Sequence, residues 1–207
     1  MISIRAGDRC FIVGTTGSGK TYLARKLLSP QSDVIVVDPK HGFEWESVPK
    51  HGGGVITSDF REVVRHEGPA PLIYRPSLSE CSVGIPWFWV WIWSRENTIV
   101  YVDEVSAITK PTTIPYEFAR CIQMGRSKNI GVWCGTQRPA RVPIVILSEA
   151  EHDFVFRLRN PADAKRMAEY TDPEILRNPA HGHECWYYGD RDQVLVKTTA
   201  DSIRVKE

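Results

Sequence analysis

The chain has 207 residues, which is the size of one ordinary domain. Hydrophobic residues make up 42% and charged residues 25%, so the chain can bury a normal core and need not be disordered. Lys and Arg number 26 against 25 Asp and Glu, and this net charge of +1 gives no whole-chain reason to expect a nucleic-acid, membrane or acidic partner.

Cysteine usage and the N-terminal residues bear on the compartment. The five cysteines include no Cys-x-x-Cys pair, and an odd, scattered set favours reduced thiols. Residues 1–5 lead directly into an apolar strand pattern, so we expect no signal peptide and a protein that is not secreted. The tryptophan-rich run at 87–93 is far shorter than the ~20 residues that a membrane-spanning helix needs.

The first half of the chain alternates between strand and helix patterns. Short apolar runs predict buried strands at 10–13, 34–37, 55–56 and 72–74. Helices are predicted at 21–28 and at 59–67, where Asp59 and Glu62 have the spacing of a capping box.

The second half continues the alternation. The run at 87–93 predicts a helix or strand in the core, apolar strands follow at 99–102 and 130–134, and Pro115 begins a helix between them. The pattern at residues 184–199 predicts a β-hairpin that turns at Gly189. Short apolar strands separated by helices predict an α/β fold, in which a mostly parallel sheet is flanked by helices on both faces.

A glycine-rich segment between the first strand and the first helix predicts a nucleotide site. It matches G-x-x-x-x-G-K-[ST] at every fixed position, and the residues are Gly14, Thr15, Thr16, Gly17, Ser18, Gly19, Lys20 and Thr21. The backbone N–H groups of such a loop surround phosphate oxygens at a helix N-terminus. Lys20 is expected to reach the β- and γ-phosphates of ATP, and the Thr21 hydroxyl to hold Mg²⁺. The fold prediction is therefore a P-loop NTPase of the RecA/ASCE type with a C-terminal β-hairpin.

Two acids at the end of the strand at 99–102 indicate the reaction. Asp103 is expected to bind Mg²⁺, and Glu104 to orient or deprotonate the attacking water. A small-molecule kinase needs no second carboxylate, because its nucleophile arrives on the substrate. The pair therefore favours hydrolysis over phosphoryl transfer to a metabolite.

A polar amide follows the strand at 130–134. Gln137, within Thr136-Gln137-Arg138-Pro139, is placed to contact both the γ-phosphate and the water. Such a contact would report the nucleotide state to the following loop. By itself the motif would favour a polar turn before Pro139.

Taken together, these motifs resemble the FtsK–HerA superfamily of DNA-pumping ATPases. The resemblance rests on the P-loop, Asp38-Pro39-Lys40, Asp103-Glu104, and Gln123-Met-Gly-Arg126 leading to Thr136-Gln137-Arg138-Pro139. It implies a further strand within 153–157 and a ring, usually of six subunits, that threads double-stranded DNA. It also implies an arginine that completes the site of the adjacent subunit, and the matching position is Arg126. Arg120, Arg138 and Arg141 are nearby competitors, and a cation at a helix C-terminus is the simpler interpretation of Arg126.

The chain resembles the genome-packaging ATPases of tailless viruses with an internal membrane more than other branches. At this length we expect no membrane segments, winged-helix domain or N-terminal barrel like those of chromosome translocases and HerA-type repair enzymes. We expect a single P-loop ATPase domain over 1–207, with a core at about 8–160 and a helical and hairpin extension at about 161–207. The resemblance implies a host-cytoplasm and packaging-vertex location, with capsid vertex or viral membrane proteins as further partners.

Three alternatives stay open at this point. They are another DNA-pumping or conjugation-type ATPase of the superfamily, a P-loop small-molecule kinase, and a nucleotide-binding assembly protein that does not hydrolyse ATP. ATP hydrolysis with and without duplex DNA, by the wild type and Glu104→Gln, separates a DNA-translocating ATPase from the kinase and the assembly protein.

Local charge permits DNA contact despite the neutral whole chain. Residues 120–166 contain nine basic and four acidic side chains, an excess of five positive charges. These cations can hold DNA phosphates, with Lys128 and Arg141 as test positions, or they can serve subunit contacts and the ATP site. The metal-capable side chains of His181, His183 and Cys185 have no second cluster, so no zinc site is predicted.

Overall fold

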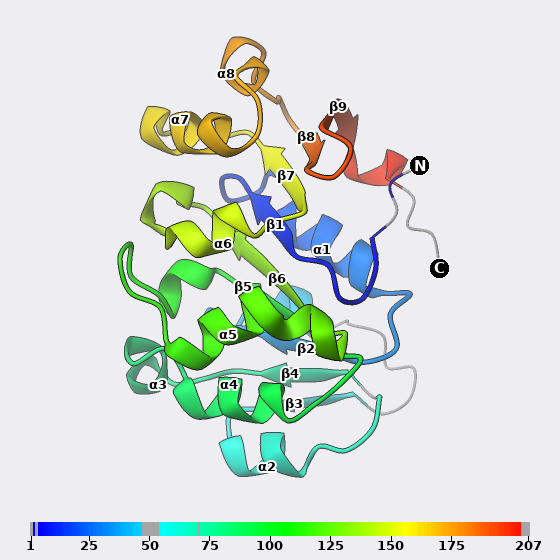
Figure 1. Ribbon diagram of the computed structural model, residues 1–207, viewed down its shortest axis with the longest axis vertical. Coiled ribbons are helices and arrows are strands. Elements are labelled where there is room, and N and C mark those ends of the chain that lie inside the picture. The colour runs from blue at the N-terminus through cyan, green and yellow to red at the C-terminus, as the bar shows by residue number, and fades with distance from the viewer. Residues whose placement is uncertain (1, 3, 47–53, 70, 204–207) are drawn as a thin grey trace.

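The structure is a computed structural model that describes residues 2, 4–46, 54–69 and 71–203. Its centre is a nine-stranded sheet of order β3-β4-β2-β5-β6-β1-β7-β8-β9 (Figure 1). The strands are β1 Cys10–Val13, β2 Val34–Val37, β3 Val55–Thr57, β4 Leu72–Tyr74, β5 Ile99–Asp103, β6 Gly131–Thr136, β7 His152–Phe156, β8 Glu184–Gly189 and β9 Val194–Thr199. All neighbouring strands from β3 to β7 are parallel, whereas β8 and β9 form an antiparallel hairpin against β7. The predicted α/β fold, with its C-terminal hairpin, is confirmed.

Helices cover both faces of this sheet. They are α1 Lys20–Leu28, α2 Phe60–Arg65, α3 Leu78–Ser82, α4 Pro86–Trp93, α5 Tyr116–Met124, α6 Ile144–Ser148, α7 Pro161–Tyr170 and α8 Glu174–Arg177. Strand side chains alternate between two cores, because successive residues of a strand point to opposite faces. Phe11 and Val13 pack with helices α4 and α5, whereas Cys10 and Ile12 pack with α1. The sheet is thus the middle of three layers.

Parallel pairing gives the sheet two distinct edges. The carboxyl ends of β1, β2, β5, β6 and β7 meet at one edge, which we call the carboxyl edge. The amino ends of the same strands meet at the other, the amino edge. In open α/β sheets ligands bind at the carboxyl edge, so the position of each polar residue relative to these edges bears on its role.

Several element boundaries differ from the sequence prediction. Strand β6 runs to Thr136 because Gly135 pairs with Asp103 and Thr136 pairs with Val13. Helix α2 ends at Arg65, since the next residue is already extended.

The predicted capping box at Asp59 and Glu62 is wrong. The Asp59 carboxylate accepts a hydrogen bond from the Arg61 N–H at 2.8 Å. The Glu62 carboxylate, however, accepts a hydrogen bond from the Thr57 hydroxyl and not from the Asp59 N–H. The Asp59 N–H donates to Thr57 Oγ1 instead. A capping box forms instead at Ser77 and Glu80 of α3.

The tryptophan-rich run forms helix α4. Phe88, Trp89 and Ile92 are buried, and Trp89 stacks on Phe118 of α5 with ring centroids 3.9 Å apart. Trp87 is 72% exposed, so only part of the run serves the core. All five cysteines are free and buried, and no helix among the described residues is long and apolar enough to cross a bilayer.

Asp153 is a buried acid within the sheet. It is 2% exposed, lies on β7 between Phe11 and Tyr188, and has one carboxylate oxygen without a hydrogen-bond partner. Burial raises the pKa of this carboxyl well above its usual range, and Asp190 raises it further. The folded protein therefore keeps a proton that the unfolded chain releases, and stability falls as the pH rises above the unfolded pKa of about 4.

We therefore expect Asp153→Asn to raise the free energy of unfolding near neutral pH by about 1–3 kcal/mol, because the neutral amide needs no proton uptake on folding at a pH where the unfolded carboxyl is ionised. The gain should shrink as the pH falls through about 4, because below that pH the wild-type carboxyl is protonated in both states. Urea unfolding of both proteins at acidic and neutral pH measures this difference. Equal stability at neutral pH would contradict the account.

Candidate nucleotide-binding site

The glycine-rich loop joins β1 to α1 at the carboxyl edge. Gly17 and Gly19 have φ of 73° and 107°, in the left-handed region that side chains disfavour. A Cβ on Gly14 would come within 2.5 Å of Phe156 Cβ, so the first loop position requires glycine for close approach to β7. The Thr15 N–H donates to the Arg157 carbonyl at 3.0 Å, which attaches the loop to the end of β7.

Inside this loop, polar groups are buried and available. Thr15 Oγ1 and Ser18 Oγ are buried without a hydrogen-bond partner, an arrangement that suits a ligand with many acceptor oxygens. Lys20 is 6% exposed, and its Nζ donates to the Thr15 carbonyl at 3.1 Å. Burial, followed by the charge of Lys40, lowers the pKa of Lys20. A bound phosphate would place a negative charge beside Lys20 and so favour its protonated ammonium form.

Asp103 ends β5 beside the loop. It is 7% exposed, and its carboxylate accepts hydrogen bonds from Trp45 Nε1 at 3.2 Å and from the Tyr101 hydroxyl at 3.3 Å. Burial raises the pKa of this carboxyl. The donor set fits Mg²⁺, because the Asp103 carboxylate and the Thr21 hydroxyl are the hard oxygen ligands that this ion prefers. Among the described residues, no group of three His, Cys, Asp or Glu side chains forms a separate metal cluster.

Glu104 follows in a left-handed conformation, with φ of 80° and ψ of 70°. Its carboxylate accepts hydrogen bonds from the hydroxyls of Ser106, at 2.6 Å, and Thr136. It also receives the Gln137 N–H at 3.3 Å and an ion pair from Lys40 Nζ at 2.9 Å. Burial alone would raise the pKa of Glu104, but Lys40 and the hydroxyl donors lower it. The group is therefore held as a carboxylate.

Gln137 connects the loop to the strand ends. Its Oε1 accepts a hydrogen bond from Thr16 Oγ1 at 2.9 Å, while its backbone N–H donates to Glu104. Strands β5, β6 and β1 are neighbours, so their three carboxyl ends come together. The structure thus brings together the P-loop residues, Asp103, Glu104 and Gln137, as the sequence led us to expect.

Arg126 lies at the amino edge, away from this group. It precedes β6, whereas Gln137 follows it, and the six residues of β6 at ~3.3 Å each place the two about 20 Å apart. Arg126 pairs with Glu151, yet its side chain remains 57% exposed. Its guanidinium therefore cannot reach the P-loop of the same chain.

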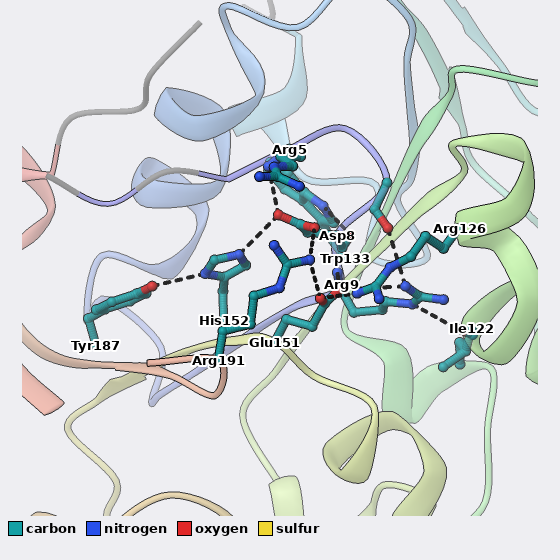
Figure 2. Close-up of polar contacts among 11 residues, drawn as sticks. Arg5, Asp8, Arg9, Ile122, Arg126, Trp133, Glu151, His152, Tyr187 and Arg191 are labelled. Carbon is teal, nitrogen blue, oxygen red and sulfur yellow. Dashed lines mark hydrogen bonds and ion pairs between the residues drawn. The ribbon is translucent and has the colours of Figure 1, made fainter. Parts of the chain in front are cut away.

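Glu151, the partner of Arg126, is part of a polar network at the amino edge (Figure 2). Glu151 also contacts Arg191 at 2.9 Å and Arg9 at 3.5 Å, and it accepts the Arg9 N–H at 3.2 Å. With these other donors on its carboxylate, Glu151 would keep compensating charge if Arg126 moved away.

Two of the competing arginines are engaged elsewhere. Arg120 stacks on Trp93, with its guanidinium carbon 3.9 Å from the ring centroid, and Arg138 Nε pairs with Asp163 at 2.8 Å. The third, Arg141, is exposed, and within the described part of the chain its side chain has no partner.

Sequence reasoning missed the roles of Lys40, Trp45 and Ser106. Lys40 belongs to the Asp38-Pro39-Lys40 motif, but its contact with Glu104 depends on β2 lying next to β5. Trp45 carried no sequence signal that would link it to Asp103. Of the metal-capable residues, Cys185 is buried in β8, and His183 Nδ1 lies 3.3 Å from the Ser18 carbonyl.

Comparison with known proteins places this fold among P-loop ATPases. No protein-family model matches the chain, and no curated protein has a matching sequence. The genome packaging NTPase B204 from Sulfolobus turreted icosahedral virus 2, in complex with AMPPCP, is 17% identical with a TM-score of 0.75, over 95% of this chain and 99% of that chain. VirB4 of Thermoanaerobacter pseudethanolicus is 12% identical with a TM-score of 0.64, over 92% and 88% of the two chains. Both are FtsK–HerA superfamily ATPases, so the resemblance predicted from the motifs is confirmed as a likeness of fold.

Proposed function

We propose that this chain belongs to the FtsK–HerA superfamily and hydrolyses ATP to move double-stranded DNA, as the genome-packaging motor of a virus. The observation that carries the proposal is the position of Glu104. Its carboxylate lies at the carboxyl end of β5, held by Thr136 and the Gln137 N–H, while Gln137 itself contacts the P-loop. A fixed carboxylate beside a phosphate-binding loop suits activation of water, which a kinase does not need.

We propose the following roles for the residues of the site. The loop from Gly14 to Thr21 holds the phosphates of ATP, with Lys20 on the β- and γ-phosphates. Thr21 and Asp103 hold Mg²⁺, which supplies charge neutralisation at the transferring phosphoryl group. Glu104 orients or deprotonates the attacking water, and Gln137 reports the state of the γ-phosphate to the loop that follows it.

Arg126 supports a ring, in line with the likeness to a packaging NTPase. Because Arg126 lies at the amino edge, it can complete only the site of another subunit. We therefore propose a homo-oligomeric ring, with six subunits as the expected number, around duplex DNA. The nine strands form one sheet, and we propose that residues 1–207 act as one motor domain, with the hairpin as an extension of its core.

The remaining parts of the proposal rest on the likeness to the packaging NTPase. We propose action in the host cytoplasm and at the packaging vertex of the virion, with capsid vertex or viral membrane proteins as partners. The alternative within the superfamily is a conjugation-type ATPase, to which the likeness to VirB4 also points.

The proposal predicts ATP hydrolysis that increases severalfold when duplex DNA is added. Phosphate release by the purified chain, measured with and without duplex DNA and with Mg²⁺ present, tests it. Absence of hydrolysis under all conditions would overturn the proposed ATPase activity. Hydrolysis that does not respond to duplex DNA would overturn the proposed DNA translocation and leave an ATPase with another cargo.

A further inference from the structure

The structure divides the basic residues of 120–166 into two groups. Five of the nine have partners: Arg120 with Trp93 and Glu117, Arg126 with Glu151, Lys128 with the Trp93 carbonyl, Arg138 with Asp163, and Arg166 with Tyr170 and Glu169. The other four are exposed and, among the described residues, have no side-chain hydrogen bond, ion pair or ring contact: Arg141, Arg157, Arg159 and Lys165. We call these four the free cation group.

The free cation group is carried by two chain segments that pack against each other. Arg141 ends the 3₁₀ turn at Pro139–Arg141, and the other three lie in the segment from the end of β7 into α7. Asp163 joins the two segments, because its carboxylate accepts Arg138 Nε at 2.8 Å and the Ala140 N–H at 3.0 Å. Asp163 is only 1% exposed, so its charge is compensated internally and does not neutralise the group.

The same surface adjoins the nucleotide site. The Arg157 carbonyl accepts the Thr15 N–H of the P-loop, and Arg138 to Arg141 directly follow Gln137, which bonds Thr16. A change in the Thr16–Gln137 contact would therefore be transmitted within a few residues to the turn that carries Arg141. The group thus lies at the carboxyl edge, whereas Lys128 lies at the amino edge.

We propose that the free cation group is the surface that holds the sugar-phosphate backbone of duplex DNA. The inference rests on the proposed function and assigns its DNA contact to particular residues. Guanidinium groups without acidic partners suit a row of phosphates and give no base readout. Protein interfaces are enriched in aromatic anchors, and the exposed aromatic side chains Tyr22, Phe43, Trp87 and Tyr116 all lie outside the two segments that carry the free cation group.

The test uses the double variant Arg141→Gln/Arg159→Gln in the full chain. Binding to a fluorescent duplex is measured by anisotropy across a range of salt concentrations. Each lost phosphate contact lowers the slope of log K against log salt by about 0.9. We therefore expect the slope to fall by about 2 and the affinity near 0.1 M salt to fall roughly 10²-fold.

The matched control is Arg61→Gln/Arg65→Gln on α2. These arginines are also exposed and without side-chain partners among the described residues, but they lie at the β3 end of the sheet. Wild-type affinity in the control and reduced affinity in the test variant would support the proposal. Equal affinity and salt slope in both would overturn it, while duplex-stimulated hydrolysis by the wild type would still support the motor. Loss of ring assembly with unchanged DNA affinity would also overturn it and assign the surface to subunit contact.

Discussion

ATP hydrolysis by the Glu104→Gln variant should fall by about 10²–10⁴-fold, while ATP binding persists. The amide keeps the size of the carboxylate but cannot accept a proton from water. Steady-state phosphate release and binding of a fluorescent ATP analogue measure the two quantities separately. A loss of rate without a loss of binding is the signature of a residue that acts on the reaction step.

A matched control for this variant is Glu96→Gln. Glu96 is exposed and lies just before the amino end of β5, so the same chemical change occurs at the opposite end of the same strand. The control should hydrolyse ATP at the wild-type rate. If Glu104→Gln also kept a rate within about threefold of wild type, Glu104 would not activate the water, and the assembly-protein alternative would gain support.

The second large effect is expected at Arg126. Arg126→Ala should lower ATP hydrolysis by about 10³–10⁵-fold, because a guanidinium supplied by a neighbour stabilises charge on the transferring phosphate. ATP binding by the isolated subunit should remain, since Arg126 lies at the amino edge, remote from its own P-loop. The same assays of phosphate release and analogue binding apply.

A mixing experiment distinguishes this role from a merely structural one. Arg126→Ala subunits retain an intact P-loop, and Lys20→Ala subunits retain an intact Arg126. Mixed rings therefore contain some interfaces with both groups, and we expect activity well above that of either variant alone. If Arg126 served only to stabilise the fold through its ion pair with Glu151, Arg126→Ala subunits would be less stable in every mixture and activity would not recover. Failure to recover, with mixed oligomers demonstrated by size, would contradict action in trans.

Local patterns in the sequence predicted most of the fold. Strands β1, β2 and β4 have the predicted bounds because each is a short apolar run that ends at a glycine, an aspartate or an arginine before proline. The capping box failed because Glu62 had a closer donor, the Thr57 hydroxyl, in the preceding strand. Spacing within a helix cannot show that an adjacent strand supplies a competing partner.

The candidate site was predictable as a set of strand ends, but not as a set of contacts. Gly14 to Thr21, Asp103, Glu104 and Gln137 follow strands whose carboxyl ends share an edge, so their convergence could be expected. The ion pair of Lys40 with Glu104 depends on β2 lying beside β5, which the sequence does not state. Likewise, only the structure separates Lys128, which bonds the Trp93 carbonyl, from Arg141, which is unpartnered among the described residues.

The backbone of Glu104 carries an implication for how this chain can evolve. A residue other than glycine with φ of 80° costs the folded state about 1–3 kcal/mol, and the surrounding contacts must offset that cost. Glycine or asparagine would accept the same conformation more readily, but neither retains the carboxylate. The backbone at position 104 therefore favours one residue type and turnover another. A lineage that no longer hydrolysed ATP would be free to replace this glutamate and relieve the backbone strain.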